Sequence, residues 1–191
     1  ICWAIASTRS LSARLRILKK IEAPLSALHL LVGLIDKVNS KGALVDFQHL
    51  QTFLKKDGAI LEEDCMCVEP LLNTKKGKTK SKVPTLCTNK RQPKRTFKVK
   101  DLIISEKVDE KKLISLVTEG PVAVSLDFYK EFEDLVGVGW NLLRSQKSRK
   151  QVEKNMVVCH GYGTVNGIHY WDIQNSAGTR WGNGGFGKVI R

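Results

Sequence analysis

Apolar side chains recur with helical spacing at the start of the chain. Within Trp3–Lys20, the side chains of Leu11, Leu15 and Leu18 fall on one stripe of a helix. Pro24 prevents this helix from continuing, because proline has no backbone N–H to donate. The pattern predicts one long helix with an apolar stripe.

The same kind of spacing predicts three more helices. One runs from about Leu25 to Val38. Another ends at Gly58, because glycine is common just after a helix C-terminus. Its apolar face is formed by Ala43, Phe47, Leu50 and Leu54. A short helix covers Asp109–Thr118, with Asp109 as its N-cap.

The last part of the chain has the alternating pattern of strands, separated by turns that contain glycine and asparagine. The predicted strands are Val122–Leu126, Asn155–Gly163, His169–Ile173 and Gly185–Ile190. Helices followed by strands favour the α+β class in two lobes. We expect a helical lobe over residues 1–104 and a strand-rich lobe over residues 105–191.

Composition narrows the class of protein. The chain has 191 residues, of which 42% are hydrophobic and 27% charged, so it can bury a core. No stretch has the roughly 18 consecutive apolar residues that a membrane helix needs. The net charge of +13 is concentrated in Lys75–Lys100, which contains no acidic residue. This segment is interpreted either as a solvated loop or as a non-specific polyanion contact.

The five cysteines do not have the spacing of a zinc site, so no metal and no cofactor is expected. Pairing of Cys65 with Cys87, or of Cys67 with Cys87, is open, and at most one disulfide is predicted. Cys2 stands at the head of the first predicted helix. The helix dipole stabilises an anion there, which suits a nucleophilic thiolate, but an inert buried cysteine has the same signature.

Two segments near the end of the chain carry a specific pattern, Gly161–Thr164 (GYGT) and Tyr170–Phe186 (YWDIQNSAGTRWGNGGF). Together with Cys2-Trp3, this pattern resembles the papain-like cysteine peptidases of the cathepsin and papain type, whose site combines Cys, His and Asn. The resemblance covers nearly the whole chain and is weakest between Glu69 and Lys100.

The resemblance implies a two-lobe α+β fold, with a helical left lobe, a β-barrel-like right lobe and a cleft between them. It implies that Cys2 is the nucleophile, that Asn175 orients the catalytic histidine, and that Gly42 and Trp181 contact substrate. It further implies proteolysis without a cofactor, peptide or protein substrates and inhibitors as partners, and a lysosomal, vacuolar or extracellular location.

The sequence departs from the family pattern where the catalytic base should stand. The histidine position, six residues before Gly161, holds Asn155, and an amide has no proton affinity near neutral pH. His160 lies five residues further along the predicted strand, an odd offset that points it to the opposite face. Ala177 replaces the tryptophan that follows Asn-Ser in the family.

The chain begins at Ile1, so we also expect it to be truncated and to lack the family's oxyanion segment. These departures predict an inactive or strongly impaired peptidase. Two alternatives remain, a non-catalytic homologue that binds peptides or inhibitors and a basic interaction protein.

Overall fold

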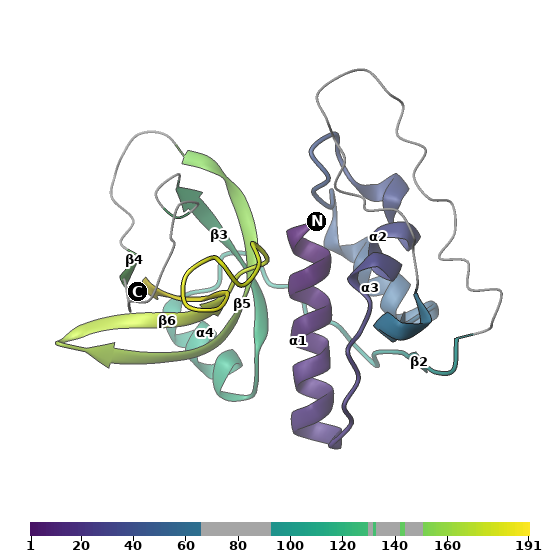
Figure 1. Cartoon of the computed structure of the whole chain (residues 1–191), viewed down its shortest axis with the longest axis horizontal. Helices are drawn as coiled ribbons and strands as arrows, with labels where there is room; N and C mark the ends of the chain where they lie inside the picture. The colour runs from purple at the N-terminus through teal and green to yellow at the C-terminus, as the bar shows by residue number, and fades with distance from the viewer. Residues whose placement is uncertain (66–92, 130–131, 133–141, 144–150) are drawn as a thin grey trace. The chain divides into compact units, whose positions relative to one another are not determined.

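A computed structural model describes residues 1–65, 93–129, 132, 142–143 and 151–191. These residues form two compact units, one of Ile1 with Ala23–Ile104 and one of Cys2–Glu22 with Ser105–Arg191 (Figure 1). The second unit takes in residues 2–22, which the sequence analysis placed in the first lobe, because the first helix packs on the strands. Most of the basic segment Lys75–Lys100 lies outside the described residues.

The first unit is built mainly from short helices. Its elements are α2 (Ala27–Gly33), η1 (Ile35–Lys37), α3 (Phe47–Lys56), β1 (Ala59–Ile60), η2 (Glu62–Asp64) and β2 (Thr96–Phe97). The prediction for α3 is confirmed for Phe47, Leu50 and Leu54, whereas Ala43 lies before the helix and is exposed. The carboxylate of Asp46 caps the N–H of Gln48 at 2.8 Å, and Gly58 follows the helix with φ +80°.

Two predictions for this unit are corrected. The α-helix expected to reach Val38 ends at Gly33 instead. The short 3-10 helix η1 (Ile35–Lys37) follows it. Gly33 faces Phe53 so closely that a Cβ at this position would lie 2.4 Å from the ring. Residues 96–97, expected in a loop, form β2 because they pair antiparallel with β1.

In its described residues, the second unit combines helices α1 and α4 with one sheet. Its elements are α1 (Cys2–Lys19), α4 (Glu110–Thr118), β3 (Val122–Tyr129), β4 (Leu142–Leu143), β5 (Gln151–Val165), β6 (Ile168–Gln174) and β7 (Phe186–Ile190). The strand order is β3-β5-β6-β7-β4, antiparallel except for the β4–β7 pair (Figure 1). The four predicted strands are confirmed, and the α+β class with them; β4 was not predicted.

Helix α1 packs against β5 and β3 through its N-terminal half. The residues buried on it are mostly small: Trp3, Ala4, Ala6, Ser7, Thr8 and Ser10. The stripe of Leu11, Leu15 and Leu18 is not the buried face, since Leu18 is 64% exposed. Small side chains let the helix backbone approach the sheet closely, and that packing decides which face is buried.

Arg14 of α1 anchors the turn between α4 and β3. Its Nε donates to the carbonyl of Pro121 at 2.9 Å and its Nη2 to that of Gly120 at 3.2 Å. The hydroxyl of Ser10 donates to the same Pro121 carbonyl at 2.8 Å. A cation at this end of α4 also complements the helix dipole. This cluster fixes α1 to the chain entering β3.

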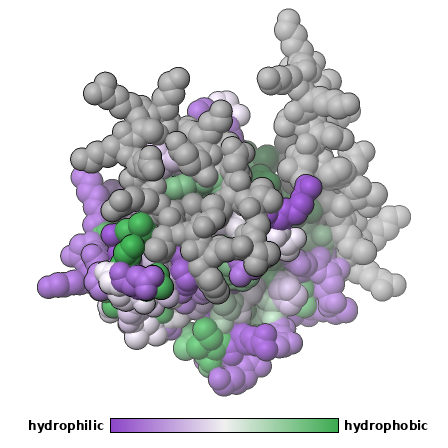
Figure 2. All heavy atoms as spheres, turned by 60° about the vertical axis from the view of Figure 1, so that its left-hand side comes forward, coloured by the Kyte–Doolittle hydropathy of each residue, from purple (hydrophilic) through white to green (hydrophobic). Residues whose placement is uncertain are grey.

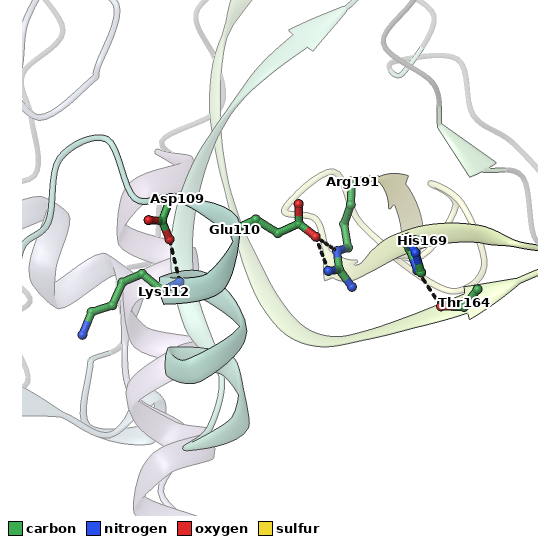
Figure 3. Close-up of polar contacts among 6 residues, drawn as sticks. All are labelled: Asp109, Glu110, Lys112, Thr164, His169 and Arg191. Carbon is green, nitrogen blue, oxygen red and sulfur yellow. Dashed lines mark hydrogen bonds and ion pairs between the residues drawn. The ribbon is translucent and has the colours of Figure 1, made fainter.

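Helix α4 is held at its other end as well. The carboxylate of Asp109 caps the N–H of Lys112 at 2.7 Å, as predicted, and Nε of Arg191 donates to Glu110 at 2.8 Å (Figure 3). The guanidinium of Arg191 lies 5.0 Å from the ring of Trp171. A buried apolar cluster of this unit contains Phe128, Phe132, Val157, Ile173 and Trp181.

The coloured surface in Figure 2 is largely hydrophilic, with apolar residues exposed in separate places. Large apolar side chains that are well exposed include Ile103 and Val45. Over the described ranges, no helix combines the length and apolar character needed to cross a membrane.

We predict that Arg14→Met lowers the free energy of unfolding by about 2 kcal/mol, because it leaves part-buried carbonyls without a charged donor. Urea denaturation measures the change. Arg16→Met on the same helix is the control, since its ion pair with Glu22 is exposed and should contribute less than about 0.5 kcal/mol. Equal losses in the two variants would contradict the anchoring role of Arg14.

Candidate functional site

Cys2 begins the helix face that packs on the sheet. Residues 2, 5, 6 and 9 share one face of α1 because they are spaced by three, four and seven positions. Ile5, Ala6 and Arg9 of this face line a small pocket together with Met156, Val158 and residues 174–176. Cys2 is half-buried and free, and the first turn of α1 contains no acidic residue. The helix dipole there favours an anion.

Asn155 and Asn175 are hydrogen-bonded to each other. Asn155 lies on β5 opposite Leu126, and Asn175 directly follows β6. The Nδ2 of Asn155 donates to the Oδ1 of Asn175 at 3.0 Å. The sequence analysis selected both residues, and the structure brings them together.

The buried Asn175 is fixed by its neighbours on every side but one. Its Oδ1 also accepts from the backbone N–H of Ser176 at 2.7 Å, and its own N–H donates to Gly185 at 2.9 Å. Its Nδ2 is buried and has no hydrogen-bond partner among the described residues. If the side-chain amide of Asn175 were flipped, Nδ2 would face the two donors that now bind Oδ1, so a flip would not give it a partner. Such an unpaired buried donor costs about 1–3 kcal/mol.

Arg9 also belongs to this arrangement, although it was not predicted from the sequence. Its Nη1 donates to the carbonyl of Asn175 at 3.1 Å, so α1 holds the segment that carries this asparagine. Arg9 lies seven residues after Cys2, two helical turns along the same face, and that spacing was the available signal. Which carbonyl Arg9 binds is decided only by the tertiary structure.

The two predicted substrate contacts lie in different units. Trp181 is 3% exposed, and its indole N–H donates to the carbonyl of Phe132 within the core of the second unit. Gly42 belongs to the first unit, where it adopts φ +78° and its N–H donates to the carbonyl of Asn39 at 2.9 Å. The contribution of Trp181 and Gly42 to substrate binding stays a prediction.

His160 contacts other side chains than the asparagine pair. The pairing of β5 with β6 shifts register between Cys159 and Gly161, so His160 is the extra residue of a bulge. Its ring lies 5.5 Å from that of Phe186. Burial lowers the pKa of His160, an effect that the charge of Asp172 opposes.

Two free thiols of the second unit differ in accessibility. Cys2 is half-buried, whereas Cys159 is 1% exposed, and burial raises the pKa of its thiol to about 11. Cys65 is disulfide-bonded, so of the five cysteines two are free and one disulfide at most is possible, as predicted. Within the described part of the chain, no group of three His, Cys, Asp or Glu side chains has the arrangement of a metal site.

Comparison with known proteins identifies the family of the chain. The sequence profile of the papain family cysteine proteases matches residues 1–191. A cysteine protease of Blomia tropicalis is 36% identical over 83 residues, which are 44% of this chain and 24% of that protein. Cathepsin L of Sarcophaga peregrina is 35% identical over 89 residues, 46% of this chain and 26% of that protein. The matched stretches thus span about a quarter of the length of these relatives.

Solved structures agree on the fold. A procathepsin B of Trypanosoma congolense superimposes with a TM-score of 0.74 at 19% identity, covering 100% of this chain and 63% of its own. A Carica candamarcensis cysteine protease in complex with E-64 gives 0.70 at 18% identity, covering 100% and 78%. At these identities the likeness establishes the papain-like fold.

We predict that a soluble alkylating reagent modifies Cys2 in the folded protein at neutral pH and reaches Cys159 only after unfolding.

Because the pKa of Cys159 is raised, its thiol keeps its proton up to a higher pH in the folded state than in the unfolded state. Stability linked to Cys159 is therefore present at neutral pH and lost as the pH rises from about 9 to about 11. Peptide mapping after labelling tests the first statement, and alkaline denaturation of the protein and of Cys159→Ala tests the second. Labelling of Cys159 in the native protein would contradict both.

Proposed function

The chain belongs to the papain family of cysteine proteases, and we propose that it is a member with absent or strongly impaired peptidase activity. One observation carries the proposal: the amide of Asn155, which stands six residues before Gly161 where the family pattern has its histidine, donates to Asn175 at 3.0 Å. In the family's Cys-His-Asn arrangement, Asn175 would orient an imidazole with this same acceptor oxygen.

The chemistry of peptide cleavage explains why this exchange matters. A thiol nucleophile needs a base to take its proton, and the leaving amine needs an acid to return one. The amide of Asn155 does neither, since it has no accessible protonation change near neutral pH. In subtilisin, loss of the base histidine lowers turnover by about 10⁶. A comparable loss is expected here.

The remaining parts of a family site are retained in the second unit. Cys2 stands at the N-terminus of an 18-residue helix, where the dipole favours a thiolate. Arg9 and Gly185 hold the backbone of Asn175. We therefore propose that the chain keeps the supports of a Cys-His-Asn site and lacks the group that transfers protons.

Family membership also supports proposals about partners and location. The Carica candamarcensis protease binds the inhibitor E-64; for this chain we propose peptide-like ligands of the same kind, engaged without cleavage. A lysosomal, vacuolar or extracellular location, and a lobe boundary near residue 104, are proposed on the same basis.

We predict no cleavage of fluorogenic dipeptidyl substrates above background from acidic to mildly alkaline pH. The protein and its Cys2→Ala variant should give equal rates, because the thiol has no base to activate it. A continuous fluorescence assay with both proteins measures this. Turnover that disappears in Cys2→Ala would overturn the proposal.

A second prediction tests the base position directly. Asn155→His should accelerate alkylation of Cys2 at mildly acidic pH by at least about tenfold, because an imidazolium stabilises the thiolate. Asn155→Gln is the matched control, since it keeps an amide and should leave the rate unchanged. Peptide hydrolysis should recover little in Asn155→His. Ala177 stands where the family has a tryptophan, and its small side chain does not shield a hydrogen bond between the new imidazole and Asn175. Equal alkylation rates in the two variants would show that Asn155 does not occupy the base position.

A further inference from the structure

The hairpin that joins β5 and β6 ends in an asparagine followed by glycine. We propose that Asn166 is a site of spontaneous deamidation, at which the backbone nitrogen of Gly167 attacks the side-chain amide. This modification is independent of the proposed function and would occur in an active or an inactive member alike.

The geometry of the turn leaves this pair of residues open. Val165 pairs with Ile168, so Asn166 and Gly167 form a two-residue turn, with φ of +49° and +76°. Positive φ at both positions is the reason for Asn-Gly here. Both residues are exposed, and a Cβ on Gly167 would meet nothing within 4 Å. Across the described residues, no hydrogen bond engages the N–H of Gly167.

The reaction needs only water. The Gly167 nitrogen loses its proton and bonds to Cγ of Asn166, and the bond from Cγ to Nδ2 breaks, releasing ammonia. The resulting five-membered succinimide is opened by water at either carbonyl, giving aspartate or isoaspartate. Glycine favours the first step because it has no side chain to hinder the attacking nitrogen. The rate rises with pH, because the attacking nitrogen must be deprotonated.

A second Asn-Gly pair provides an internal comparison. Asn183 precedes Gly184, but the backbone of Asn183 is held twice: its N–H donates to Phe186 at 2.9 Å and its carbonyl accepts from Phe186 at 3.1 Å. The attacking geometry requires rotation about the Asn backbone, which these two bonds oppose. We therefore expect Asn166 to react before Asn183.

The asparagines of the candidate site are protected. Asn155 lies within β5 and precedes Met156, whose side chain hinders attack by its own nitrogen. Asn175 is 2% exposed, and the N–H of Ser176 already donates to its Oδ1. Deamidation of Asn155, which would place a carboxylate at the base position, is thus excluded as the main reaction.

The consequence of modification at Asn166 is local. Each event exchanges a neutral amide for a carboxylate on a chain of net charge +13, and isoaspartate adds one backbone atom to the turn. Just inside the turn, Thr164 and His169 share a hydrogen bond of 2.7 Å that ties the two strands together (Figure 3). The hairpin should therefore remain paired after the reaction.

The test is to incubate the full chain at neutral and at mildly alkaline pH and to follow charge variants by isoelectric focusing. Asn166→Gly and Asn183→Gly are the matched variants. Each removes one side-chain amide, and at residue 166 glycine also adopts the φ of +49° without strain. Peptide mapping with an isoaspartate-specific methyltransferase locates the product.

The expected result is an acidic variant that accumulates faster at the higher pH, in the parent protein and in Asn183→Gly, and that is lost in Asn166→Gly. Isoaspartate should map to residue 166. Persistence of the variant in Asn166→Gly, its loss in Asn183→Gly, or no acidic variant at all would each overturn the proposal.

Discussion

The close packing of α1 on β5 and β3 is the interaction on which the second unit depends. Small residues such as Ala6 and Ser10 bring the helix backbone against the strand-rich part of the unit. Two arginines on the same helix then bond to carbonyls of the strand-rich part, Arg14 at Pro121 and Arg9 at Asn175. The helix that begins with Cys2 is thereby held against the segments that carry both asparagines.

The hydrogen bonds around Asn175 fix its backbone and only one side of its amide. The backbone of Asn175 is held by Arg9 and Gly185, and its Oδ1 accepts two hydrogen bonds. The Nδ2 of the same side chain is left buried without a partner in the described part of the chain. Asn155 thus donates to the side-chain oxygen of Asn175 but gives its Nδ2 no partner. An unpaired buried donor is energetically costly in a protein interior.

In the sheet, the surroundings of His160 and Cys159 decide which chemistry each side chain can perform. His160 is the histidine closest to the base position in sequence, yet a bulge places its ring against Phe186 and near Asp172. Cys159, beside it, is a buried thiol whose pKa is raised to about 11. His160 contacts Phe186 rather than a nucleophile, and the thiol of Cys159 is too deeply buried for nucleophilic chemistry.

The sequence alone determined the α+β class, most of the helices with the cap at Asp109, the four main strands and the candidate residues of the site. These features follow from local periodicity, turn chemistry and a specific pattern near the end of the chain. Tertiary structure decided which face of α1 is buried, since Leu18 is exposed while Ala4 is not. It also decided that Arg9 meets Asn175 and that Trp181 is core. Such contacts join residues more than a hundred positions apart or depend on packing, and no local pattern in the sequence encodes them.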